Sequence, residues 1–176
     1  MITTPVPEPG PQGPGFVVRA ATAAEWASVR EVRLAMLADP SGAFGHGPDA
    51  EAGLPEQHWR EVAAAWADGE EILFVSEGRE GVWLGVMGCR VRGEGPELAW
   101  VWVDPAHRGP GGVTDALLDA VERWAAPRGD ALHLKVFTDV GRAVAAYRRR
   151  GFCAVGEPVP AREPGRADWV MRKPLR

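Results

Sequence analysis

A glycine-rich segment between an apolar run and an amphipathic pattern offers the clearest chemistry in this sequence. The segment, Arg108 to Gly112 (RGPGG), follows the apolar run Leu98 to Val103 and precedes residues 113–124, where apolar side chains recur at helical spacing. Aromatic and β-branched residues predict that the run is a buried strand. The glycines would then lead into a helix N-terminus, where free N–H groups and the helix dipole favour phosphate. This segment predicts a site for a phosphate-bearing cofactor.

The other reactive side chains form no recognisable nucleophile or metal site. Cys89 and Cys153 lie far apart, and no pair among the four histidines has metal-ligand spacing. No serine or cysteine lies in a nucleophile motif. We therefore expect no metal, and we interpret both cysteines as buried thiols in a reducing compartment.

A basic cluster, Arg148-Arg149-Arg150 together with Arg142, lies in a segment of helical spacing near the C-terminus. Cationic side chains near the C-terminal end of a helix are favourable, and a solvated helix face is the simplest interpretation. Contact with cofactor phosphates is a second interpretation and nucleic-acid binding a third. The net charge of −4 argues against the third, so we predict no nucleic-acid partner.

Composition predicts one globular domain after a short tail. The 176 residues are 45% hydrophobic and 25% charged, which is ordinary for a folded domain. Residues 1–15 are mostly proline, glycine and small polar residues and are expected to be a flexible tail before a domain at 16–176. The start lacks a signal-peptide pattern, and no segment has the roughly 20 apolar residues that cross a bilayer. We expect a cytoplasmic protein that does not bind membranes.

The order of predicted elements indicates a mixed sheet with helices packed on it. Thr22 and Glu25 have capping-box spacing at the start of a helix, Asp139 is a candidate cap for the last helix, and Gly151 is placed to end it. A long loop is expected at 41–54. We expect strands at 16–19, 72–75, 82–91, 98–103, 132–136, 152–155 and 169–172, and helices at 22–38, 55–67, 113–128 and 140–150.

Two motifs within this order resemble the GNAT superfamily of acyl-CoA-dependent N-acyltransferases. They are V-x-P-x-x-R-G-x-G at Val103 to Gly111 and A-x-x-x-Y-x-x-x-G-F at Ala143 to Phe152. The resemblance covers nearly everything after the tail. It implies an α/β (α+β) fold: a mixed, mostly antiparallel central sheet of six or seven strands, flanked by about four helices, with a splayed central strand pair.

The resemblance also implies that acetyl-CoA is the acyl donor and a primary amine of a small molecule or protein the acceptor. In this family the turn binds the pyrophosphate of coenzyme A through backbone N–H groups, the preceding strand contacts the pantetheine arm and thioester, and the tyrosine helix completes the site. The corresponding positions are Arg108, Gly109, Pro110, Gly111, Gly112, Val113 and Thr114 in the turn, Trp100, Val101, Trp102 and Val103 in the strand, and Val140, Arg142 and Ala143 in the helix.

This chain departs from the family pattern at two places. Val113 stands where a small residue is usual, so that Gly112 is an extra residue in the turn, and Val140 replaces a common asparagine. These departures leave open a second hypothesis, a degenerate GNAT-like module that binds acyl-CoA as a sensor without turnover.

Amide formation needs a base for an ammonium of pKa about 10.4, a donor to the oxyanion and an acid for the departing thiolate. The resemblance assigns Glu97 as the base, Tyr147 as the acid and a backbone N–H near Val101 to the oxyanion, with direct transfer in a ternary complex. The alternatives are that Glu97 is a solvated strand-end carboxylate and Tyr147 a core aromatic. The acceptor stays open, with specificity expected in the loops at 41–54 and 157–168, and the protein is expected to be a monomer or homodimer.

Overall fold

The structure, a computed structural model, describes residues 15–44, 47–109 and 112–175. Its strands are β1 (Val17–Ala20), β2 (Glu71–Glu77), β3 (Trp83–Arg92), β4 (Gly95–Val103), β5 (Ala131–Phe137), β6 (Cys153–Ala154), β7 (Val159–Pro160) and β8 (Ala167–Pro174). Its α-helices are α1 (Trp26–Leu37), α2 (Asp49–Ala52), α3 (Glu56–Ala65), α4 (Val113–Ala125) and α5 (Gly141–Arg149).

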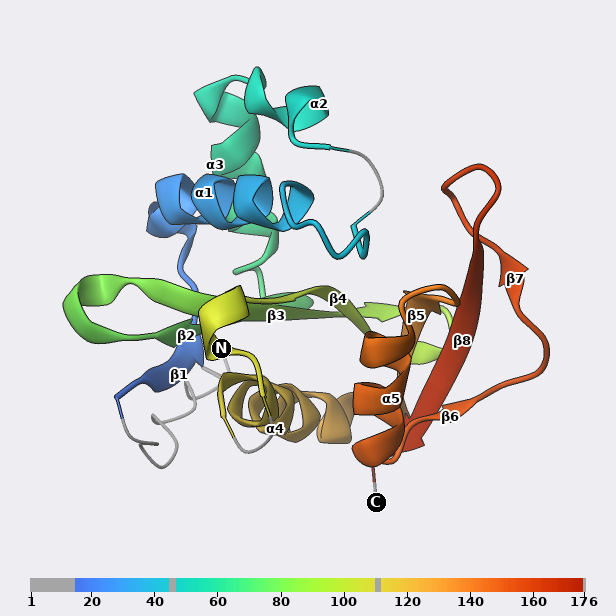
Figure 1. The fold of residues 1–176 in the computed structure, drawn as a ribbon. Helices are drawn as coiled ribbons and strands as arrows, with labels where there is room; N and C mark the ends of the chain where they lie inside the picture. Colours follow the sequence, from blue (N-terminus) through green and yellow to red (C-terminus); the bar gives the residue numbers. More distant parts are fainter. Residues whose placement is uncertain (1–14, 45–46, 110–111, 176) are drawn as a thin grey trace.

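The described strands form one open sheet in the order β1-β2-β3-β4-β5-β8-β6, with β7 paired to β8. Every strand pair is antiparallel except β4 and β5, which run parallel. Helices α1, α2 and α3 lie on one side of this sheet, and α4 and α5 lie on the other (Figure 1). The predicted fold class is therefore confirmed.

Two short elements were not predicted, so the described sheet has eight strands rather than six or seven and the described helices number five rather than four. Helix α2 lies in the expected loop at 41–54, and its Glu51 accepts two hydrogen bonds from Arg33 on α1, at 2.9 and 2.7 Å. Strand β7 has two residues and exists only as a partner of β8. Neither element shows a periodic pattern of apolar residues in the sequence. Contacts with α1 and β8 hold α2 and β7 in place, respectively.

Of the three predicted helix-end residues or pairs, the Thr22–Glu25 capping box and Gly151 were correct and Asp139 was wrong. The Thr22 N–H donates to Glu25 Oε2 at 2.8 Å, so the capping box is present, although a 3₁₀ turn precedes α1. Gly151 has φ +89° and ends α5. Asp139 does not cap α5: Val140 is the N-cap, and the Asp139 carboxylate instead accepts from Arg166 Nε at 3.1 Å. The Asp139 carboxylate is thus engaged by a bidentate guanidinium rather than by the N–H groups at the start of α5.

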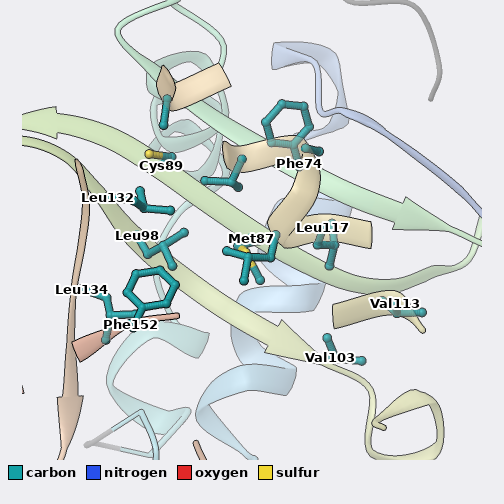
Figure 2. Close-up of a cluster of buried hydrophobic side chains, with 14 of the residues drawn as sticks. Phe74, Met87, Cys89, Leu98, Val103, Val113, Leu117, Leu132, Leu134 and Phe152 are labelled. Atoms are coloured by element: carbon teal, nitrogen blue, oxygen red, sulfur yellow. The ribbon is translucent and has the colours of Figure 1, made fainter. Parts of the chain in front are cut away.

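The sheet has a hydrophobic core on each face. Apolar residues of α4 at helical spacing cover one face, and Figure 2 shows this α4-side core. The other face, the α1-side core, is covered by α1 and α3. The α4-side core includes Phe74, Met87, Leu98, Val103, Val113, Leu117, Leu132, Leu134 and Phe152, and the α1-side core includes Val29, Met36, Trp66, Leu73, Val86 and Trp102.

A bulge in β4 changes which side chains face which core. Gly88 pairs with Ala99 but Val86 pairs with Trp102, so β4 has one extra residue between these pairs. Trp100 takes a left-handed conformation with φ +51°, which is unusual for a bulky residue. Ala99 and Trp100 consequently both pack toward the α1-side core, although they are adjacent in sequence. After the bulge Val101 faces the α4-side core.

Replacing Gly88 by alanine should destabilise the fold at the bulge. A Cβ at this position would lie 2.6 Å from Trp66 Cη2 and 3.0 Å from the Ala99 carbonyl oxygen, so the indole or the strand must move. We expect a loss of about 1–3 kcal/mol, and about 2–4 °C in Tm per kcal/mol, by thermal unfolding. Gly93→Ala is the control, because a Cβ there meets no atom within 4 Å. Equal Tm values for the two variants would contradict this account.

Candidate functional site

Strands β4 and β5 form a gap in the middle of the sheet. They run parallel, yet in the described chain the single residue pair that joins them is Glu97 with His133, near the start of each strand. Beyond this pair the strands separate, so the backbone groups of β4 that face β5 have no ladder partner there. A ligand with amide groups fits such an edge, since it supplies the missing donors and acceptors.

The gap leads to the predicted phosphate turn. The first hydrogen bond within α4 runs from the Ala116 N–H to the Gly112 carbonyl at 3.1 Å, so the N–H groups of Val113 and Thr114 have no acceptor within the helix. This is the geometry of an anion site. Gly109 has φ +150°, a conformation that glycine adopts without strain. Of the predicted turn residues, Pro110 and Gly111 lie outside the described residues.

Val113, which departs from the family pattern, points into the protein. Its side chain is 3% exposed in the α4-side core, and a Cβ added to Gly85 would lie 3.1 Å from Val113 Cγ1. The valine therefore fills space between α4 and the sheet and leaves its N–H at the helix start. Gly112, predicted to be an extra residue of the turn, is the N-cap of α4.

The Arg108 side chain turns away from the helix start. Its Nε donates to the Val103 carbonyl at 2.7 Å, and its Nη2 pairs with Asp39. The Asp39 carboxylate is only 1% exposed and also accepts from Trp102 Nε1 at 3.1 Å and from the Ser41 N–H at 2.9 Å. The guanidinium is thus committed to the protein, so Arg108 can offer a ligand its backbone rather than its charge.

The environment of Asp39 controls its ionisation. Burial alone would raise the pKa of Asp39, but hydrogen bonds from Ser41 and from Arg108 outweigh it and lower the pKa to about 2. The carboxylate is therefore ionised throughout the physiological range, as its pairing with Arg108 requires.

Asp39 should make the stability of the protein sensitive to acid. Because its pKa is lowered by folding, the stability it contributes is fully present above the unfolded value of about 4 and is lost as pH falls toward the folded value. The difference in Tm between the unaltered chain and Asp39→Asn should be largest above about pH 5 and should shrink between about pH 4 and pH 2. Thermal unfolding at steps of pH measures it, and a difference that stays constant over this range would be contrary to expectation.

The predicted strand residues line the gap from both faces. Trp100 lies against Trp66, with ring centroids 5.5 Å apart, and the Arg33 guanidinium carbon lies 5.0 Å from its ring centroid. These contacts support the strained backbone of Trp100. Trp102 is buried on the same α1 side, whereas Val101 contacts the α4-side core. The left-handed conformation of Trp100 therefore changes the direction of the backbone at the next residue, Val101, beside the gap.

Glu97 lies in a hollow on the α1 side of the sheet. Side chains alternate along this part of β4: Leu98 packs in the α4-side core, so Glu97, like Ala99, faces the α1 side. Its Oε1 is 3.5 Å from Arg90 Nη2, and both side chains are about one-third exposed, at 29% and 34%. The hollow has a volume of about 250 Å³, and its lining includes Glu97, Glu94, His133, Lys135 and Val170.

Tyr147 approaches the gap from the opposite side. It packs in the α4-side core, edge-to-face on Phe152 with ring centroids 5.6 Å apart. Burial raises the pKa of Tyr147, so the phenol stays protonated at neutral pH. Among the described residues none forms a hydrogen bond with its hydroxyl, which leaves that O–H free to serve a ligand. Glu97 and Tyr147 are thus on opposite faces of the sheet rather than side by side.

The other predicted residues of α5 have different roles. Val140 is the N-cap, and its carbonyl accepts from the Ala143 and Val144 N–H groups at 3.0 and 3.2 Å. Arg142 is exposed in the first turn and Ala143 is half-buried. The asparagine-to-valine change therefore removes a polar side chain at the start of this helix while the helix itself still forms.

The basic cluster is partly used for packing. Arg150 forms ion pairs with three acidic residues on α4, and Lys173 of β8 binds one of them, Glu122, at 2.5 Å. The partners of Arg150 are Asp115 at 3.2 Å, Asp119, and Glu122 at 3.4 Å. Arg148 and Arg149 are exposed. Arg150 thus joins α5 to α4. These ion pairs explain the position of its side chain without a phosphate or nucleic-acid partner.

Three residues at the site were not found from the sequence: Asp39, Arg90 and Arg166. Asp39 was interpreted only as part of the Asp-Pro that ends a helix, and its partner Arg108 lies 69 residues away. No local pattern links them. Within the described parts of the chain no cluster of metal-ligating side chains is present, and none of the described helices is long and apolar enough to cross a membrane.

Comparisons with known proteins agree with this geometry. Residues 33–152 match the model of the acetyltransferase (GNAT) family. The chain is similar to the crystal structure of a nourseothricin acetyltransferase, with 28% identity over 62% of this chain and 68% of that one and a TM-score of 0.56. A GNAT-family acetyltransferase from Streptococcus pneumoniae is 18% identical, over 92% of this chain and 99% of that one, with a TM-score of 0.72.

A putative acetyltransferase from Salmonella typhimurium, solved with its cofactor acetyl-CoA, is 17% identical over 92% of this chain and 94% of that one, with a TM-score of 0.72. No curated protein matches the chain. The family match spans more than half of the sequence and includes the phosphate turn, the gap-lining strand and Tyr147. The chain belongs to the GNAT acetyltransferase family.

Proposed function

We propose that this protein is an N-acetyltransferase that moves an acetyl group from acetyl-CoA to a primary amine by direct transfer in a ternary complex. The observation that supports it most is the separation of β4 and β5 beyond the Glu97–His133 pair. It opens the middle of the sheet to both faces, so that donor and acceptor can meet there. Glu97 and Tyr147 flank this opening.

The donor fits the described residues. Its pyrophosphate would accept hydrogen bonds from the free N–H groups of Val113 and Thr114 at the start of α4. Its pantetheine arm carries amides that match the unpaired edge of β4 between Trp100 and Val103. The thioester would then lie in the gap.

Each group of the site would perform one part of the transfer. Glu97, directly or through a water, takes a proton from the acceptor ammonium, and the free amine attacks the thioester carbon on the α1 side. A C–N bond forms and the C–S bond breaks. The backbone N–H near Val101, aimed by the left-handed Trp100, stabilises the negative charge that develops on the carbonyl oxygen. Tyr147 donates its proton to the departing sulfur from the α4 side, the nitrogen gives up its second proton to water, and the tyrosinate regains a proton from solvent.

The named relatives suggest which acceptors to try first. One is a nourseothricin acetyltransferase, and another, 15% identical with a TM-score of 0.69, is a spermidine N-acetyltransferase from Vibrio cholerae in complex with CoA and spermine. We propose that the acceptor is a small-molecule or protein amine that enters from the α1 side, where the hollow beside Glu97 carries two carboxylates.

Incubation with acetyl-CoA and an amine panel tests this function. The panel would contain nourseothricin, spermidine, spermine, aminoglycosides and peptides with free N-termini or lysines, with release of free thiol as the readout. We expect at least one amine to raise turnover well above the hydrolysis blank. Calorimetric titration with coenzyme A on the same preparation separates the alternatives: binding without turnover for any amine would point to a sensor module, and no binding would contradict the proposed donor.

A further inference from the structure

The connection after α1 crosses the open end of the gap. Parallel strands end at the same edge of a sheet, so β4 and β5 both exit here. Asp39 pairs with Arg108, which follows β4, and the Gly42 carbonyl accepts from Arg166 Nη1 at 2.7 Å. Arg166 in turn binds Asp139, which follows β5. Residues 39–42, the bridging segment, span at most about 10 Å and link the exits of the two strands.

The β4 end of this bridge is a buried network. Asp39 is 1% exposed and accepts hydrogen bonds from Ser41, Trp102 and Arg108. Arg108 also donates to the Val103 carbonyl at 2.7 Å, so its guanidinium joins the last residue of β4 to the bridge. Removing one member of a buried, fully paired network leaves its partners unpaired, which costs more than the bond itself.

The β5 end is held by a different set of contacts. Arg166 Nε donates to Asp139 at 3.1 Å, and its guanidinium carbon lies 3.4 Å from the ring centroid of Phe137, the last residue of β5. Arg166 is 20% exposed, so its cation–π contact is partly shielded from water, whereas the Asp139 carboxylate of the charge pair is 61% exposed. Residues 39–42 therefore contact residues at both strand exits, through Asp39 on the β4 side and through the Gly42 carbonyl on the β5 side.

We infer that Asp39 is a positioning residue for coenzyme A binding, which fixes the phosphate turn through Arg108 and Trp102 without touching the ligand. This inference rests on the proposed function for the identity of the ligand. When Arg108 is held, the described backbone from Val103 to Gly109 is fixed before the ligand arrives. When it is released, the ligand must order that backbone itself, and affinity falls by the cost of doing so.

Titration of coenzyme A into variants, by calorimetry well below Tm, tests the inference. We expect Asp39→Asn to raise Kd about tenfold, and Arg108→Gln to do the same. Because the two residues act as one unit, the double variant should be no weaker than either single variant. Trp102→Phe keeps an aromatic ring in the α1-side core but removes one donor to Asp39, and should raise Kd by a smaller factor. It keeps the test informative if Asp39→Asn does not fold.

Asp68→Asn is the matched control. Asp68 also accepts two backbone hydrogen bonds, from the Glu70 and Glu71 N–H groups at 2.9 and 3.1 Å, but it lies in the turn before β2, and none of the described arginines pairs with it. We expect its loss to leave Kd unchanged even if Tm falls. A merely structural role for Asp39 would give the same pattern as this control.

The outcomes separate the inference from the proposed function. An unchanged Kd in Asp39→Asn and in Trp102→Phe, or strictly additive effects of Asp39→Asn and Arg108→Gln, would overturn the inference and leave the proposed function standing. Binding of coenzyme A by the unaltered chain without turnover on any amine would overturn the proposed function alone. No binding by the unaltered chain would overturn both.

Discussion

Replacing Tyr147 by phenylalanine is expected to lower kcat by about 100-fold, while Tm and the Kd for coenzyme A stay close to those of the unaltered chain. Phenylalanine keeps the edge-to-face contact with Phe152 and the packing in the α4-side core, so the fold loses little. What it loses is the hydroxyl that we propose protonates the departing sulfur. Single-turnover thiol release, compared with steady-state rates, shows whether the loss lies in the chemical step.

The same residue can be followed without any acceptor. Tyr147 is the only tyrosine in the sequence, so the absorbance change on forming tyrosinate reports this residue alone. Since burial raises its pKa, we expect tyrosinate to appear only above the ordinary value of about 10, and the signal to be absent in Tyr147→Phe. Full kcat in Tyr147→Phe would show that water or another group protonates the sulfur.

Replacing Glu97 by glutamine is expected to lower kcat/KM by about 100-fold near neutral pH. Glutamine has nearly the same shape but accepts no proton at this pH. The deficit should narrow as pH rises toward the acceptor pKa of about 10, because an amine that is already neutral needs no base. A pH profile of both proteins with the best amine of the panel measures this.

Two further variants distinguish a base from a structural carboxylate. Glu94 lines the same hollow but is an exposed residue of the β3–β4 turn, so Glu94→Gln should leave the pH profile unchanged. Arg90 is the ion-pair partner of Glu97. If Glu97 served only that pair, Arg90→Gln would reproduce the whole loss of turnover, and the loss in Glu97→Gln would not depend on pH.

Local patterns account for most of the elements at this site. The strand from Leu98 to Val103, the glycine turn and the amphipathic helix after it were all predicted, because strand propensity, backbone freedom at glycine and helical spacing act within a few residues. The same is true of the capping box at Thr22 and of Gly151. The motif around Tyr147 carried the family resemblance, and the family is confirmed.

The roles of the charged residues depended on contacts that no local pattern contains. Asp139 was predicted to cap α5, but its carboxylate pairs with Arg166, 27 residues away, instead. Arg108 turned from the phosphate turn toward Asp39, 69 residues away. Short elements such as α2 and β7 were missed for the same reason, since their partners, rather than their own sequences, stabilise them.

The sequence by itself determined the strand, the phosphate turn, the helix and the types of residue that could move protons. Only the tertiary structure decided how they are arranged: the bulge at Trp100 reverses the faces of β4, and Glu97 and Tyr147 lie on opposite faces of the sheet. The physical reason is distance along the chain. Backbone propensities act between neighbours, whereas a bulge register, an ion pair or a shared gap requires surfaces that meet only after the sheet has formed.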